Sequence, residues 1–202
     1  MFPRAMTVSA APKPAKHWNL PNLLTYGRVA CVPFVVACLF WPEEFWMRWL
    51  ALAIFTVAAI TDFFDGYLAR AWSQQSSLGR MLDPIADKLL VAASLLALVA
   101  DRTISGWSLW AAIVILCREI LVSGLREYLA ELRVSVPVST VAKWKTTLQI
   151  VALGFLIAGP AGEYVLPGTV RIGLALLWIA AILTLYTGWD YLKAGIKHVT
   201  DE

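Results

Sequence analysis

The chain has 202 residues, of which 59% are hydrophobic and only 15% are charged, and its formal net charge is +3. Soluble domains average about 45–50% apolar and about 25% charged residues, so this composition excludes a disordered chain and favours an integral membrane protein. Three cysteines, an odd number, exclude a secreted disulfide scaffold, and so weak a positive charge without a dense basic stripe argues against nucleic-acid binding.

Long apolar segments follow one another along most of the chain. A helix that crosses a bilayer needs roughly 20 mostly apolar residues. Six segments meet this requirement: 22–41, 48–70, 81–100, 107–130, 144–160 and 170–191. Their apolar residues do not alternate with polar ones, which argues against a β-barrel. We therefore expect an all-α bundle of six transmembrane helices that forms one domain over residues 19–202, preceded by a flexible tail over residues 1–18.

Basic residues gather on one side of this predicted bundle. They lie in the tail, in the second and fourth connections and near the C-terminus: Arg4, Lys13, Lys16, Arg70, Arg80, Arg133, Lys143, Lys145, Lys193 and Lys197. Because cytoplasmic loops of membrane proteins are enriched in Lys and Arg, we expect both termini in the cytoplasm.

Four aspartates interrupt the apolar segments at that same side. Asp62 and Asp65 close the second segment on one helical face, and Asp83 and Asp87 open the third on one face. The polar link 72–79 predicts a hairpin in which the two faces meet. Ionised carboxylates near hydrocarbon cost several kcal/mol or more, so either some stay protonated or divalent cations neutralise them. Oxygen ligands without nearby His or Cys favour Mg²⁺ or Mn²⁺ over Zn²⁺.

Two small residues, Gly66 and Ala69, leave a bare strip of helix beside the aspartates. Such a strip serves either close helix packing or the approach of a ligand, and the neighbouring Arg70 favours a ligand.

The spacing Asp62-x2-Asp65-Gly66-x2-Ala69-Arg70-x8-Gly79-x3-Asp83-x3-Asp87 resembles the signature of the CDP-alcohol phosphatidyltransferase family. The resemblance implies six membrane helices around a cytoplasm-facing polar cavity, and two Mg²⁺ or Mn²⁺ ions held by the four aspartates. It further implies that Asp87 is the general base, that the acceptor alcohol attacks the lipid phosphate of CDP-diacylglycerol with release of CMP, and that the protein is a homodimer in the bacterial cytoplasmic membrane.

The resemblance also implies a pocket for the CDP part of the lipid, with Gly79 at the turn of the hairpin. The candidates for this pocket are Gly66, Ala69, Arg70, Gly79 and, less specifically, Ser76, Asn22 and Thr25. Thr25 and the nearby Arg28 have an alternative interpretation, in which they cap the first helix or reach the membrane interface.

Cations in the fourth and fifth segments indicate a phosphorylated acceptor. Arg118 and Arg126 lie two turns apart on one apolar helix, and Lys143 and Lys145 lie at the start of the next. A phosphate monoester is a natural partner for these cations. Alternatively, Arg118 and Arg126 pair with the glutamates that follow them, and the lysines bind lipid headgroups.

The segments around these cations are similar to those of family members whose acceptor is sn-glycerol 3-phosphate. Members with other acceptors, of the cardiolipin or inositol-phosphate type, share some of these features. Glu119, Ser123 and Arg126 form a further polar stripe at i, i+4 and i+7. Outside the family, an intramembrane prenyltransferase and a cation transporter remain as alternatives.

Overall fold

The structure, a computed structural model, describes residues 20–41, 44–72, 77–131 and 140–200, with the side chains at 20–21, 63–72, 77–80, 83, 131, 140–143, 190 and 194–200 left out. These residues form helices and short turns and contain no strand. The helices are α1 (Leu20–Leu39), α2 (Phe45–Trp72), α3 (Ser77–Ala100), α4 (Ser108–Glu131), α5 (Thr140–Glu163) and α6 (Thr169–Thr200). The predicted all-α bundle of six helices is confirmed.

The helix ends differ from the predicted ones by a few residues at most positions. The largest difference is at the end of α6, which was expected at 191 and lies at Thr200. The start of α3 also differs: it lies at Ser77, a residue type favoured at helix starts. Gly79 therefore lies in the first turn of α3, and its expected place in the link of the hairpin is wrong. The predicted tail over residues 1–18 and Ser76 lie outside the described residues.

Five helices are long and apolar enough to cross a membrane, judged on the described residues. Their apolar windows are Asn22–Leu39, Phe45–Asp62, Ser108–Ala130, Trp144–Glu163 and Thr169–Lys193. The sixth helix, α3, falls short of this measure because its first half carries Asp83, Asp87 and Lys88, which confines its apolar run to Leu89–Ala100. It nevertheless packs against α1, α4 and α5 inside the bundle, so its acidic half must be neutralised there.

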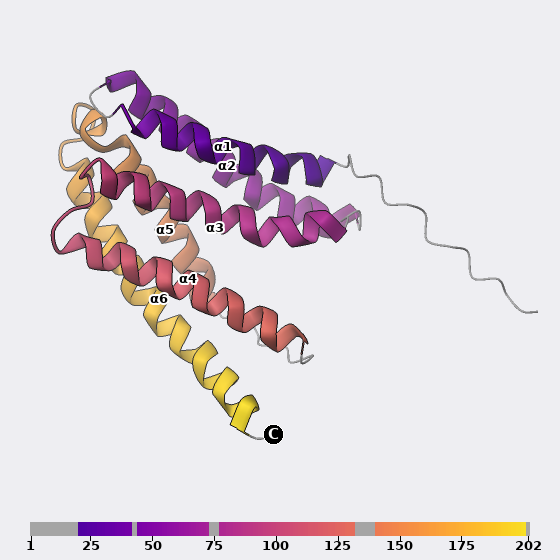
Figure 1. The fold of residues 1–202 in the computed structure, drawn as a ribbon. Coiled ribbons are helices and arrows are strands. Elements are labelled where there is room, and N and C mark those ends of the chain that lie inside the picture. The colour runs from indigo at the N-terminus through magenta and orange to yellow at the C-terminus, as the bar shows by residue number, and fades with distance from the viewer. Residues whose placement is uncertain (1–19, 42–43, 73–76, 132–139, 201–202) are drawn as a thin grey trace, which may run out of the picture.

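The helices alternate in direction, so the start of α1 and the C-terminal ends of α2, α4 and α6 lie at one end of the bundle (Figure 1). The most extensive packing joins α5 to α6, and α1 to α2 and α3. Small residues allow close approach: the α carbon of Gly173 lies so near Leu156 that a Cβ there would come within 2.9 Å of its side chain. The core is a continuous apolar cluster that includes Phe55, Leu95 and Leu153.

Arg48 ties three parts of the chain together at the opposite end of the bundle. Its Nη2 donates to Asp101 Oδ2 at 2.7 Å and to Thr103 Oγ1 at 3.2 Å, in the connection between α3 and α4. Both charged side chains are nearly inaccessible, at 2% and 3% exposure. Asp101 lies in a turn after α3, and the sequence gives no sign that it pairs with Arg48.

The same guanidinium also compensates for a break in α5. Gly159 has the left-handed φ of 47°, and the following Pro160 has no N–H to donate to the Leu156 carbonyl. Arg48 Nη1 lies 3.5 Å from that carbonyl and 3.4 Å from the carbonyl of Ile157. A side chain at Gly159 would collide with this contact, since its Cβ would lie 2.8 Å from Arg48 Nη1.

We predict that Arg48→Met strongly destabilises the protein, because it leaves the Asp101 carboxylate buried without its counter-charge. Removing one partner of a buried pair costs about 3–5 kcal/mol. The measurement is the unfolding midpoint in detergent micelles. The exposed Arg102, in the same connection, supplies the control Arg102→Met, and an equal loss in both variants would contradict the prediction.

Candidate active site

Polar side chains from every helix meet at the end of the bundle where α2 ends and α3 begins. On one side of this group, Arg28 of α1 forms an ion pair through Nη1 with Oδ1 of Asp62 of α2. The Arg28 side chain is only 1% exposed, whereas the Asp62 side chain is 36% exposed. Arg28 therefore brings a buried positive charge to one of the predicted metal ligands while leaving that carboxylate accessible.

Asp87 of α3 lies between this pair and the next group of charges. It is within electrostatic reach of Asp62 and Arg28 on one side and of Glu119 on the other. Asp62 of α2 and Asp87 of α3, the two predicted ligands whose side chains are described, thus interact electrostatically, and both helices pack against α1. The side chains of Asp65 and Asp83 lie outside the described ones, although both residues are helical.

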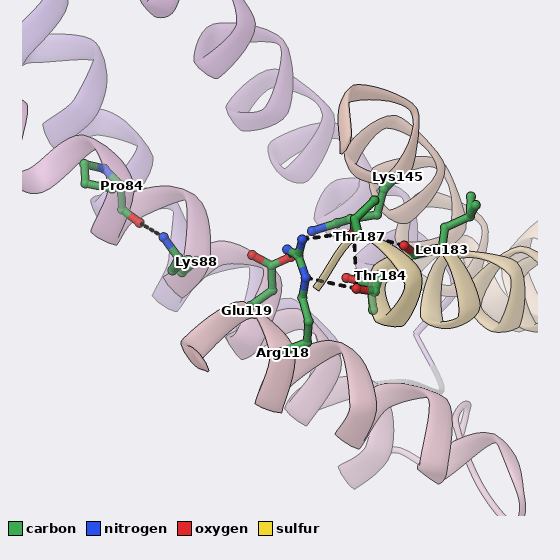
Figure 2. Close-up of polar contacts among 8 residues, drawn as sticks. All are labelled: Pro84, Lys88, Arg118, Glu119, Lys145, Leu183, Thr184 and Thr187. Carbon is green, nitrogen blue, oxygen red and sulfur yellow. Dashed lines mark hydrogen bonds and ion pairs between the residues drawn. The ribbon is translucent and has the colours of Figure 1, made fainter. Parts of the chain in front are cut away.

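The second group of charges centres on Glu119 of α4. Its Oε1 accepts hydrogen bonds from Nζ of Lys145 on α5 and from Nη1 of Arg118, the latter at 3.3 Å (Figure 2). Lys145 is 5% exposed at its side chain, so Glu119 supplies a counter-charge that this ammonium needs. The ion pair between Arg118 and Glu119, one alternative left open by the sequence, is therefore formed, and Glu119 also binds a cation on the next helix.

Helix α6 holds Arg118 from the other side. The Nε donates to the Thr184 carbonyl at 3.1 Å and the Nη2 donates to Thr187 Oγ1 at 3.0 Å. Gly188 permits this approach, since a Cβ there would lie 3.2 Å from Arg118 Cγ. Each terminal nitrogen of Arg118 carries a second N–H beyond these contacts, so the side chain is oriented by the protein and still able to bind an anion.

A polar pocket of about 290 Å³ opens between α3 and α4 beside these charges. Lys88 lines it on α3, and its polar lining on α4 consists of Arg118, Glu119, Ser123, Arg126 and Glu127. All residues that line the pocket belong to these two helices. The pocket brings together the two arginines that the sequence assigned to an acceptor phosphate.

The donor set fits the hard divalent cation that the resemblance implies. Asp62 and Asp87 offer carboxylate oxygens from adjacent helices, and such oxygens are the preferred ligands of Mg²⁺ and Mn²⁺. Among the described side chains, which leave out those of Asp65 and Asp83, no group of three or more His, Cys, Asp or Glu residues could hold a metal ion.

The remaining predicted residues lie as follows. Asn22 and Thr25 are buried in α1, both in polar contact with other groups. Gly66, Ala69 and Arg70 are helical residues of α2, and Lys143 is a helical residue of α5, with their side chains outside the described ones. Sequence reasoning missed Thr184 and Thr187, because single threonines in an apolar helix give no signal of a partner on α4.

Comparison with known proteins gives one family. Residues 18–186 match the family described as CDP-alcohol phosphatidyltransferase. A protein of Rickettsia bellii is 47% identical over 180 residues, which cover 89% of this chain and 97% of the relative. Proteins of Shigella flexneri serotype 5b and Cereibacter sphaeroides are 44% and 38% identical over 189 and 220 residues, with 92% of this chain and 99% of each relative covered. All three carry the name CDP-diacylglycerol–glycerol-3-phosphate 3-phosphatidyltransferase.

The pair of Arg28 and Asp62 can be tested by a double-mutant cycle with Arg28→Met and Asp62→Asn. We expect the two losses of stability to be non-additive, with a coupling of about 1 kcal/mol, since Asp62 is partly exposed and its charge is screened. The free energies of unfolding in mixed micelles without divalent cations give the coupling. Additive losses would show that the two charges do not interact.

Proposed function

The chain belongs to the CDP-alcohol phosphatidyltransferase family, enzymes of phospholipid synthesis, and we propose that its acceptor is sn-glycerol 3-phosphate. The products are then phosphatidylglycerophosphate and CMP. The observation that carries this proposal is the polar pocket in which Arg118 and Arg126 line one wall next to the helix of Asp87. The printed names of the three relatives describe the same reaction.

The pocket suits a small phosphorylated alcohol. Two guanidinium groups favour a phosphate monoester, which they can bind through paired N–H donors. Arg118 is held toward the pocket by α6, so little side-chain freedom is lost when the phosphate binds. Lys145 and Lys143 add positive charge at the start of α5. An uncharged polyol would offer Arg118 and Arg126 no anionic group to bind.

The reaction needs a group that removes the proton of the attacking hydroxyl, and Asp87 is the candidate. The acceptor oxygen forms a bond to the phosphorus that carries the diacylglycerol, the bond from that phosphorus to the CMP oxygen breaks, and the proton passes to the Asp87 carboxylate. Asp87 lies between Asp62 and Glu119, close to the pocket helix α4. Such a positioned base typically accelerates a reaction by about 10²–10⁴-fold.

Asp62, Asp65, Asp83 and Asp87 would hold two Mg²⁺ or Mn²⁺ ions, which when bound neutralise charge on the diphosphate oxygens. The CDP group would bind next to them, against Gly66, Ala69, Arg70 and Gly79, with Asn22, Thr25 and Ser76 at its edge. Arg28 keeps Asp62 oriented from the buried side.

The orientation follows from the basic residues around this end of the bundle. We infer that both termini and the site face the cytoplasm of a bacterial inner membrane, where a soluble acceptor and its lipid partner can meet. A homodimer stays a prediction of the family resemblance.

An acceptor screen tests the function directly. Purified protein in detergent with Mg²⁺ and CDP-diacylglycerol should release CMP with sn-glycerol 3-phosphate, and far less with inositol, serine, inositol phosphate or phosphatidylglycerol. Parallel reactions with an excess of chelator measure release that does not need the metal. Release with phosphatidylglycerol or inositol phosphate instead would move the acceptor assignment to another member of the family.

Asp87→Asn tests the base. We expect turnover to fall by about 10²-fold or more while binding of CDP-diacylglycerol stays measurable, because the amide keeps the shape of the side chain and cannot accept the proton. CMP release and lipid binding are measured on the same preparation. The exposed Glu44 at the opposite end supplies the control Glu44→Gln, and near-normal turnover of Asp87→Asn would refute the assignment.

A further inference from the structure

Two acids, Glu119 and Glu127, line a pocket otherwise suited to an anion. Glu119 is the one that also binds the cations Lys145 and Arg118. Its Oε1 accepts hydrogen bonds from Lys145 and Arg118. These contacts account for one of the two carboxylate oxygens. A carboxylate near a bound phosphate repels it, so a pocket that served the phosphate alone would gain from having a neutral residue here. The second oxygen therefore calls for a different explanation.

The second oxygen, Oε2, faces the pocket. Figure 2 shows it on the side of the carboxylate away from Arg118 and Lys145, toward Lys88 and α3. Lys88 and Glu119 line the same pocket, and Lys88 donates to the carbonyl of Pro84, at 3.3 Å. Within the described part of the chain, Oε2 has no hydrogen-bond donor of its own.

The polar groups of the pocket thus form two regions, one that donates hydrogen bonds to a ligand and one that accepts them. Arg118 and Arg126 are suited to bind an anion. Glu119 Oε2 can only accept a hydrogen bond, so it is suited to bind a donor. A ligand that binds both regions has a phosphate at one end and a hydroxyl group a short distance along the same molecule.

We propose that Glu119 Oε2 accepts a hydrogen bond from the hydroxyl on the central carbon of the acceptor. The assignment rests on the proposed function, in which the terminal hydroxyl reacts and the phosphate binds the arginines. Glu119 is then a specificity-determining residue: it selects phosphorylated polyols with a hydroxyl beside the reacting one over phosphorylated simple alcohols.

The experiment compares two acceptors, sn-glycerol 3-phosphate and 3-hydroxypropyl phosphate, which lacks only the central hydroxyl. We expect the wild-type protein to favour the first by about 10- to 100-fold in kcat/KM, the range for a hydrogen bond to a charged group. In Glu119→Gln the charge is lost and the preference should fall below about 3-fold, because the activity with sn-glycerol 3-phosphate drops far more than that with the analogue.

The ratio separates recognition from structural damage, since a distorted site lowers both activities together. Thr187→Val is the matched control: it removes a contact of Arg118 on the phosphate side, so both activities should fall in proportion and the preference should persist. If Glu119→Gln does not fold, Glu119→Asp, which withdraws the oxygen by one methylene, serves the same comparison.

Two outcomes would overturn the inference: no preference in the wild-type protein, or an unchanged preference in the Glu119 variants. A wild-type protein that releases no CMP with sn-glycerol 3-phosphate would instead contradict the proposed function, so the two failures are distinguishable.

Discussion

A charge among apolar helices must find a partner on another helix, because neither lipid nor hydrocarbon side chains can solvate it. This requirement organises the protein. Arg28 meets Asp62, Lys145 meets Glu119, and Arg48 meets Asp101, each across at least one helix boundary. The ion pairs therefore fix how the helices are placed relative to one another, which apolar packing, being non-directional, does only loosely.

The two ends of the bundle meet this requirement in different ways. Around Arg48 the protein itself supplies acceptors from the connection after α3 and from the broken turn of α5. The charge of Arg48 is thus compensated by Asp101 within the protein. At the other end Glu119 and Arg118 are only partly used by the protein, and they border a pocket. One end stabilises the fold, and the other has hydrogen-bonding groups that can bind substrates.

The sequence predicts the helices well because their length and apolar content are set by a bilayer rather than by tertiary detail. It also indicates that Asp62 and Asp87 belong to one group of charges, since helical spacing fixes which residues share a face. It does not reveal that Arg48 pairs with Asp101, because nothing local links residues on different helices. For the same reason it left open whether Arg118 binds Glu119 or a phosphate, and the structure indicates that the first contact can prepare the second.

The hydrogen bonds between Arg118 and α6 have a consequence for how the protein is inserted into the membrane. A ribosome delivers α4 to the membrane long before α6, so during synthesis Arg118 enters the bilayer without the threonine acceptors that later hold it. Glu119, its immediate neighbour, is the one partner present from the start. The adjacent acid thus pairs with the arginine during insertion, and α6 adds its contacts to Arg118 once it has entered the membrane.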